Sequence, residues 1–217
     1  MWTEACLRSG QPRLVLVDGT DGAGKTTLVA GLVSRLDSNP SIVCGPRLGA
    51  FLPCGDDARR FGEWVTSSPV DEVNRTMLFA STRRLNYTWN HAAPGATVAL
   101  DRGPATVLAS CIVRKSQADG LSLADAQEIV QHQLDEHPLY PAINDAELAG
   151  VLCYVPSRSL ILQRCMPDAK DARYASYLCA LHELLTPEWG VVGQHLLVRG
   201  DADIRIALSN IESALAV

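Results

Sequence analysis

Lysine is scarce in this chain of 217 residues: three lysines (Lys25, Lys115 and Lys170) stand among 19 basic residues, and the rest are arginines. The formal charge is -5 and the basic residues form no run. This pattern favours neither nonspecific binding to nucleic acid nor an electrostatic anchor at a membrane. No stretch of 18 apolar residues is present, so we expect no transmembrane helix and no membrane partner.

Paired cysteine motifs are also missing. The seven cysteines are odd in number and include no C-x-x-C pair. This count favours free thiols in a reducing cytoplasm over a disulfide framework or a zinc site. Residues 1–10 lack the apolar core of a signal peptide, so we expect a cytoplasmic protein. The length and an apolar fraction of 47% predict one domain spanning residues 1–217.

Short apolar runs alternate with helical stripes along the chain. We expect strands at 14–17, 41–44, 96–100 and 151–155, and a fifth within 191–198. Helices are expected from Thr26 to Leu36, from Pro69 onward, from Ser122 to Leu134 and from Ile204 to Leu215. Ser68 with Asp71, and Ser122 with Asp125, have the spacing of helix-capping pairs. The alternation predicts an α/β protein with a five-stranded parallel sheet between two helical layers.

A phosphate-binding loop follows the first expected strand. Residues 19–26 read G-T-D-G-A-G-K-T, which fits G-x4-G-K-[ST] in full. The glycines let backbone N–H groups turn toward phosphate oxygens, and the helix N-terminus favours an anion. We expect Lys25 to reach the β- and γ-phosphates of ATP and the Thr26 hydroxyl to ligate Mg²⁺. The predicted ATP-binding residues are Gly19, Asp21, Gly22, Ala23, Gly24, Lys25, Thr26 and Thr27. No N-K-x-D sequence is present, which argues against a GTPase.

A carboxylate ends another apolar strand at Asp101, and Arg102 follows it. The carboxyl ends of parallel strands lie at one edge of the sheet, so Asp101 is expected to approach the phosphate loop. Asp101 is therefore a candidate second magnesium residue with Thr26, and could accept a proton from an attacking hydroxyl. Arg102 is a candidate site for an anion on the acceptor.

An aromatic ring and a guanidinium share one face of the helix that begins near Pro69. Phe79 and Arg83 are four residues apart, and Tyr87 extends the same stripe. Such a pair can stack on a planar group and hydrogen-bond its edge. Ordinary core packing of Phe79 is the alternative explanation.

Four blocks resemble the thymidylate kinase-like P-loop kinases. They read VDGTDGAGKTTL at 17–28, LFASTRR at 78–84, LDR at 100–102 and ARY at 172–174. The resemblance implies a P-loop kinase fold with a small lid at about 164–175 and an acceptor-binding region at about 45–92. It also implies ATP and Mg²⁺ as cofactors and a possible homodimer.

The same resemblance implies roles for individual residues. Asp21 would contact an acceptor hydroxyl, Phe79 would stack on the acceptor ring and Arg83 would bond its edge. Arg102 and Arg47 would bind an acceptor phosphate. Because Gly22 follows the loop aspartate, the resemblance implies that a lid residue supplies a charge-stabilising cation, from among Arg164, Lys170 and Arg173. The candidate catalytic residues are Lys25, Asp101, Arg102, Arg164 and Arg173.

Departures from the family pattern leave the acceptor open. Gly103 and Ser110 stand where the family has aromatic residues. The first hypothesis is an ATP-dependent kinase of a nucleoside monophosphate similar to dTMP. The alternative is a kinase of the same fold that phosphorylates a hydroxyl of a nucleoside, sugar or aminoglycoside-type metabolite. A third is a nucleotide-binding regulator without catalysis. A cationic acceptor would favour the carboxylates Asp56, Asp57, Glu63, Asp71 and Glu72.

Overall fold

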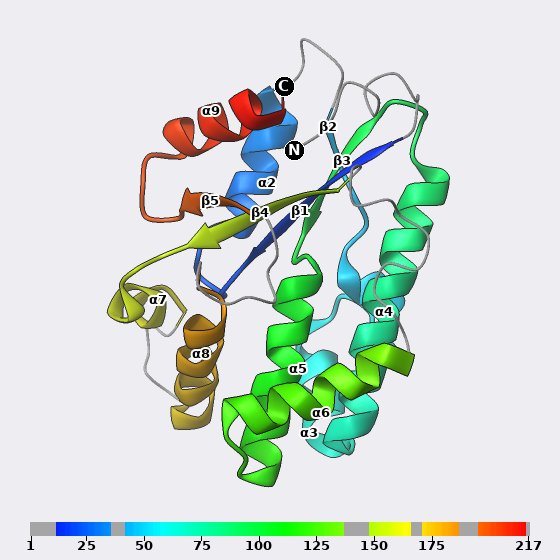
Figure 1. Ribbon diagram of the computed structural model, residues 1–217, viewed down its shortest axis with the longest axis vertical. Coiled ribbons are helices and arrows are strands. Elements are labelled where there is room, and N and C mark those ends of the chain that lie inside the picture. The colour runs from blue at the N-terminus through cyan, green and yellow to red at the C-terminus, as the bar shows by residue number, and fades with distance from the viewer. Residues whose placement is uncertain (1–11, 36–41, 137–147, 166–170, 187–194, 216–217) are drawn as a thin grey trace.

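The computed structural model describes residues 12–35, 42–136, 148–165, 171–186 and 195–215 (Figure 1). The strands of the described chain are β1 (Arg13–Gly19), β2 (Ile42–Cys44), β3 (Thr97–Asp101), β4 (Leu148–Tyr154) and β5 (His195–Arg199). Its helices are α2 (Lys25–Arg35), the 3-10 turn η1 (Leu48–Phe51), α3 (Ala58–Ser67), α4 (Val70–His91), α5 (Pro104–Asp119), α6 (Leu123–Glu136), α7 (Arg158–Cys165), α8 (Ala172–Leu184) and α9 (Ile204–Leu215).

The five strands form one parallel sheet in the order β2-β3-β1-β4-β5. This confirms the predicted fold class. Strand β1 is central, and its partners Asp101 on β3 and Cys153 on β4 align with Val17 and Gly19. The phosphate loop therefore leaves the middle of the sheet at its carboxyl edge, where ligands of parallel sheets bind.

Strand β1 divides the core because its side chains alternate between the two faces of the sheet. Val15 and Val17 are fully buried against α2 and α9. Leu14 and Leu16 point to the other face, where Leu85 of α4 covers them. Figure 1 shows α2 and α9 on one side of the sheet and α4 and α5 on the other. Asp18 continues the stripe of Leu14 and Leu16 toward α5.

Helix α5 was not expected from the sequence. Eleven of its 16 residues are buried, including Val107, Leu108, Cys111 and Ile112. Residues 104–113 of this helix are all buried, and it packs against α4, α6 and α8. A helix that is buried on every side over most of its length lacks the one-sided periodicity from which an amphipathic helix is predicted.

The two expected capping pairs have different outcomes. At α6 the Ser122 hydroxyl accepts from the backbone N–H of Asp125 at 3.1 Å, as predicted. The pair of Ser68 and Asp71 is wrong: α4 is capped by Pro69 without a side-chain hydrogen bond. The reason is that the Asp71 carboxylate accepts hydrogen bonds from Lys115 at 2.7 Å and 3.0 Å instead.

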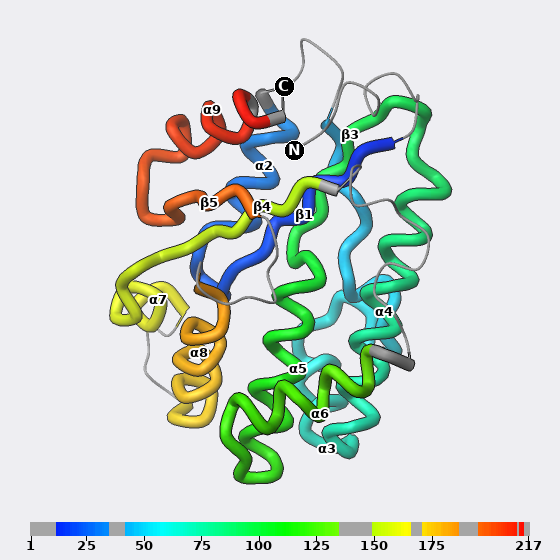
Figure 2. The backbone as a smooth tube through the Cα atoms, viewed as in Figure 1, coloured from blue at the N-terminus to red at the C-terminus, as the bar shows by residue number. Residues whose placement is uncertain are grey.

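Lys115 joins three helices that lie beside one another (Figure 2). The side chain is 9% exposed and also contacts Asp119 at 2.8 Å, while Gln133 of α6 donates to Asp71. The hydrogen bonds to Asp119 and Asp71 raise the pKa of Lys115, and the bond from Lys115 lowers the pKa of Asp71. The network thus links α4, α5 and α6.

In the described parts of the chain, the cysteines and the helices match two predictions, free thiols and no membrane-spanning helix. Cys44, Cys54, Cys111, Cys153, Cys165 and Cys179 are all free. Every helix in the described ranges is too short or too polar to cross a membrane.

Candidate active site

The phosphate loop turns between β1 and α2 on residues with left-handed backbone. Gly22 has φ 78° and Gly24 has φ 95°, which L side chains rarely adopt. At Gly22 an added Cβ would also lie 2.6 Å from Cys165 Sγ. The loop borders a cavity of about 650 Å³, whose lining includes Thr26, Thr27, Arg164 and Ile204. A loop of this shape at a helix N-terminus is suited to a polyphosphate.

Lys25 begins α2 and is 5% exposed. Its Nζ donates to the carbonyl oxygen of Thr20 at 2.8 Å and lies 3.6 Å from Asp21 Oδ1. Burial lowers the pKa of Lys25, and the Asp21 carboxylate opposes that shift. The ammonium is thus held against the backbone of the loop. Its contact with the phosphates of ATP stays a prediction.

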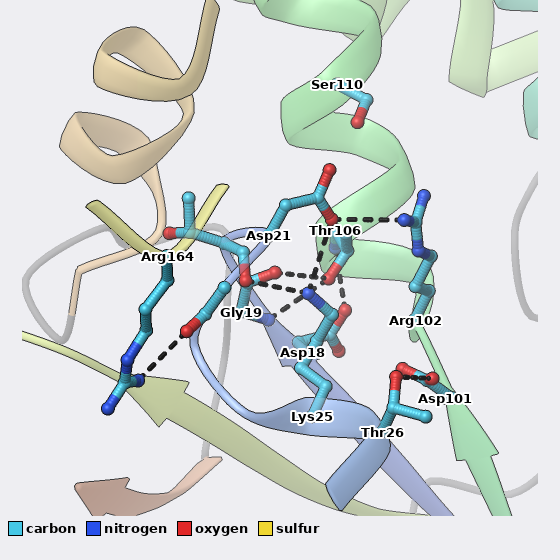
Figure 3. A network of polar contacts seen from close by, with 12 residues as sticks. Asp18, Gly19, Asp21, Lys25, Thr26, Asp101, Arg102, Thr106, Ser110 and Arg164 are labelled. Carbon is cyan, nitrogen blue, oxygen red and sulfur yellow. Dashed lines mark hydrogen bonds and ion pairs between the residues drawn. The ribbon is translucent and has the colours of Figure 1, made fainter. Parts of the chain in front are cut away.

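Thr26 and Asp101 meet although 75 residues separate them in sequence. The Thr26 hydroxyl donates to Asp101 Oδ2 at 2.6 Å, and Asp101 Oδ1 is buried without a hydrogen-bond partner in the described residues (Figure 3). The described chain contains no cluster of three or more His, Cys, Asp or Glu side chains suited to a metal. A hydroxyl and a single carboxylate fit Mg²⁺, which takes few protein ligands and completes its shell with water and substrate phosphates.

Asp21 and Arg102 form an ion pair beside the loop. Arg102 Nη2 lies 3.1 Å from Asp21 Oδ1, and both side chains border the cavity. Burial would lower the pKa of Arg102, but Asp21, Tyr177 and Asp101 outweigh it and raise that pKa. The pair places a carboxylate and a permanent cation on the side of the loop nearest α5.

Asp18 of β1 holds the start of the phosphate loop through Thr106 of α5, a role that was not predicted from the sequence. It is fully buried, and its Oδ1 accepts from the backbone N–H of Thr106 at 2.7 Å. The Thr106 hydroxyl in turn accepts from the N–H of Gly19 at 3.1 Å (Figure 3). His195 Nε2 lies 3.5 Å from Asp18 Oδ2. The start of the phosphate loop is thereby tied to the N-terminus of α5.

Arg84 is the second residue that the sequence interpretation missed. It is 3% exposed and donates three hydrogen bonds of 2.8 Å, to the carbonyl oxygens of Pro46, Asp101 and Arg102. Its helical spacing from Met77 and Ser81 could have indicated burial, because both lie on the buried face of α4 together with Leu85. A charged residue is rarely buried unless it is bonded.

Phe79, Arg83 and Tyr87 lie on the outer face of α4. The Arg83 guanidinium carbon is 5.7 Å from the centre of the Phe79 ring, so the predicted aromatic–guanidinium pair is present. The Phe79 ring is 49% exposed, which argues against ordinary core packing. Arg47, which precedes η1, is exposed as well.

An aromatic side chain does lie beside Ser110 of α5, but it belongs to α8 and not to α5. Tyr177 of α8 places its hydroxyl 2.8 Å from the Ser110 hydroxyl. Tyr174 stacks on Tyr177 and borders the cavity with Asp21 and Arg102. Burial, then the Asp21 carboxylate, raise the pKa of Tyr174 to about 12. Helix α8 therefore supplies aromatic surface next to the Asp21–Arg102 pair.

The three cations expected in the lid differ in position. Arg164 at the end of α7 donates from Nη1 to the carbonyl oxygens of Gly22 at 3.0 Å and Gly200 at 3.1 Å. Arg173 is exposed at the start of α8, where its backbone N–H is bound by Asp171. Lys170 lies outside the described residues. Among these three lid residues, Arg164 is therefore the one that the described chain shows in contact with the phosphate loop, through the carbonyl oxygen of Gly22.

Three of the five acidic residues considered for a cationic acceptor have local partners. Asp57 caps α3, Glu63 contacts Arg59 at 2.9 Å and Asp71 binds Lys115. Helix capping and ion pairing therefore explain these three carboxylates without a cationic acceptor.

Gly200 lies against the phosphate loop, and replacing it tests the cavity. A Cβ at this position would collide with the carbonyl oxygen of Ala23, which is backbone and cannot turn aside. Overpacking of this kind costs about 1–3 kcal/mol, so we expect Gly200→Ala to weaken ATP binding about tenfold. Titration calorimetry measures this affinity. Gly62→Ala, in open space on α3, is the matched control. Equal ATP affinity in both variants would contradict the assignment of the cavity.

Comparison with known proteins agrees with this geometry at the level of the fold. No protein-family model matches the chain, and no curated protein is similar to it in sequence. A deoxyadenosine kinase from M. mycoides, solved with bound dATP, has a TM-score of 0.66 at 15% identity, over 94% of this chain and 100% of that one. The thymidylate kinase of Candida albicans has a TM-score of 0.64 at 13% identity, over 95% and 92%. The chain has the fold of these kinases.

Proposed function

We propose that the protein is an ATP-dependent phosphotransferase that moves the γ-phosphoryl group of ATP to a small acceptor of the nucleoside class, with a nucleoside monophosphate as the first candidate. The observation that carries the proposal is the meeting of Thr26 and Asp101, at 2.6 Å, beside a buried lysine on a complete phosphate loop. The two solved kinases of the same fold are named for acceptors of this class, which supports it.

The donor side follows from the loop. Backbone N–H groups and Lys25 bind the phosphates of ATP, while Thr26 and Asp101 hold Mg²⁺. Bound Mg²⁺ supplies neutralisation of the charge on the transferring phosphoryl group. Arg164, bound to the carbonyl oxygens of Gly22 and Gly200, keeps the loop against the segment after β5 and closes this side of the cavity.

In this proposal the acceptor lies beside Asp21 and Arg102, which border the cavity, and on the exposed face of α4 that carries Phe79 and Arg83. Phe79 offers a ring to stack on a base and Arg83 offers N–H groups to its edge. Arg102, with Arg47, binds an acceptor phosphate. For a hydroxyl acceptor, Asp21 or Asp101 would accept the hydroxyl proton as the acceptor oxygen bonds to the γ-phosphorus, while the bond from that phosphorus to the β,γ-bridging oxygen breaks and ADP leaves. The exposed aromatic face of α4 supports a planar acceptor.

An acceptor screen tests the proposal. The purified protein is incubated with MgATP and, separately, each common nucleoside and nucleoside 5′-monophosphate, and ADP release is coupled to a spectroscopic readout. We expect acceptor-dependent ADP release and, by mass spectrometry, an acceptor carrying one more phosphoryl group. ATP binding without transfer to any acceptor of either panel would favour the non-catalytic regulator. Transfer to nucleosides alone would favour the hydroxyl alternative.

A further inference from the structure

The guanidinium of Arg84 is buried behind the candidate site and faces backbone rather than a carboxylate. Its three hydrogen bonds use three of the five N–H groups of an arginine side chain, and all three acceptors are carbonyl oxygens. Burial lowers the pKa of Arg84 to about 10, with Asp101 and Asp18 opposing the shift. The side chain therefore remains a cation near neutral pH.

The three carbonyls belong to segments that carry proposed site residues. Asp101 is the magnesium carboxylate, Arg102 pairs with Asp21, and Pro46 directly precedes Arg47. Arg84 itself lies on α4 beside Arg83. One guanidinium thus joins the acceptor-side helix to the ends of β2 and β3.

The backbone at Arg102 needs such a restraint. Its φ of 63° makes it the one residue other than glycine with a positive φ in the described chain. That conformation is unfavourable for a residue with a Cβ and persists only where the surroundings enforce it. Two bonds from Arg84 hold the carbonyls on both sides of this bend, and Gly103 N–H donates to Val17 at 3.2 Å.

We propose that Arg84 is a positioning residue for the phosphoryl transfer proposed above, on which this inference rests. It holds the Asp101 carboxylate toward Thr26 and the Arg102 side chain toward Asp21, and it touches neither ATP nor acceptor. Removing its hydrogen bonds therefore weakens the metal site and the acceptor site together. The nucleotide contacts of the phosphate loop stay intact, because they come from β1 and α2.

Arg84→Lys separates the geometry from the charge. A lysine keeps the cation, but its single ammonium cannot span three carbonyls in a fixed fork. Partners behind a metal ligand commonly change metal affinity 10- to 100-fold, so we expect the affinity for Mn²⁺ to fall about tenfold. It is measured by electron paramagnetic resonance with a nonhydrolysable ATP analogue. The KM of any acceptor found should rise as strongly, while the affinity for the analogue in the absence of metal stays unchanged.

Arg75→Lys is the matched control, because Arg75 is an exposed arginine on the same helix. Arg84→Gln, which keeps two N–H donors without the charge, is the second variant. Unchanged Mn²⁺ affinity in a folded Arg84→Lys or Arg84→Gln protein would overturn the proposal. So would failure of both to fold, since Arg84 would then serve folding alone. The Mn²⁺ measurement needs no acceptor, so it stays decisive even if the acceptor screen finds none.

Discussion

Replacing Lys25 with alanine is expected to abolish phosphoryl transfer, lowering kcat about a thousandfold. The ammonium is held inside the loop by the Thr20 carbonyl and is 5% exposed, so a compact cation stands where charge spreads over the transferred group. Among the described residues few other cations are available there, because Arg102 is paired with Asp21 and Arg164 binds backbone carbonyls. Single-turnover transfer with saturating MgATP measures the effect.

The control for this variant is Lys115→Ala, the same substitution at a lysine remote from the loop. It breaks the contacts to Asp71 and Asp119 and should lower the free energy of unfolding while leaving kcat per folded molecule unchanged. If Lys25→Ala kept its turnover, the phosphate-loop assignment would be wrong.

Asp101→Asn should be the second most damaging change, with kcat about a hundredfold lower and ATP affinity altered far less. Asparagine can still accept a hydrogen bond from Thr26, but it removes the negative charge that favours Mg²⁺. Because the metal acts mainly on the transition state, the loss is expected in kcat rather than in binding. Steady-state kinetics over a magnesium titration, with calorimetric ATP affinity, distinguishes the two.

Asp119→Asn serves as its control, since it removes an acidic charge from the far end of α5. A large loss of ATP affinity in Asp101→Asn at unchanged kcat would instead assign Asp101 to ground-state binding. Partial recovery of the variant at high magnesium concentration would agree with its proposed role.

Local sequence patterns predicted the sheet and the place of the phosphate loop between β1 and α2. Strand β1 is a short apolar run that ends at a glycine. The conformation of the loop depends mainly on its own glycines, so both features can be recognised from local sequence. The meeting of Thr26 with Asp101 also followed from topology, since both come after parallel strands at one edge.

Residues whose role depends on distant partners were not predictable. Asp18 and Thr106 are 88 positions apart, and nothing local at either position indicates their hydrogen bond. Ser68 has the local pattern of a cap, but Asp71 binds Lys115 from another helix. Likewise Tyr177 reaches Ser110 across 67 positions, so the aromatic group beside residue 110 could not be assigned from the segment near Asp101.

The left-handed backbone at Arg102 also bears on thermal stability. A residue with a Cβ gives up about 1 kcal/mol in this conformation relative to glycine. Replacing Arg102 with glycine would remove that strain. The same substitution would also remove the cation that pairs with Asp21. Selection of variants for heat resistance alone should therefore drift toward a more stable, inactive protein at this position. In the proposed reaction, the bend at Arg102 therefore favours catalysis at a cost in folding stability.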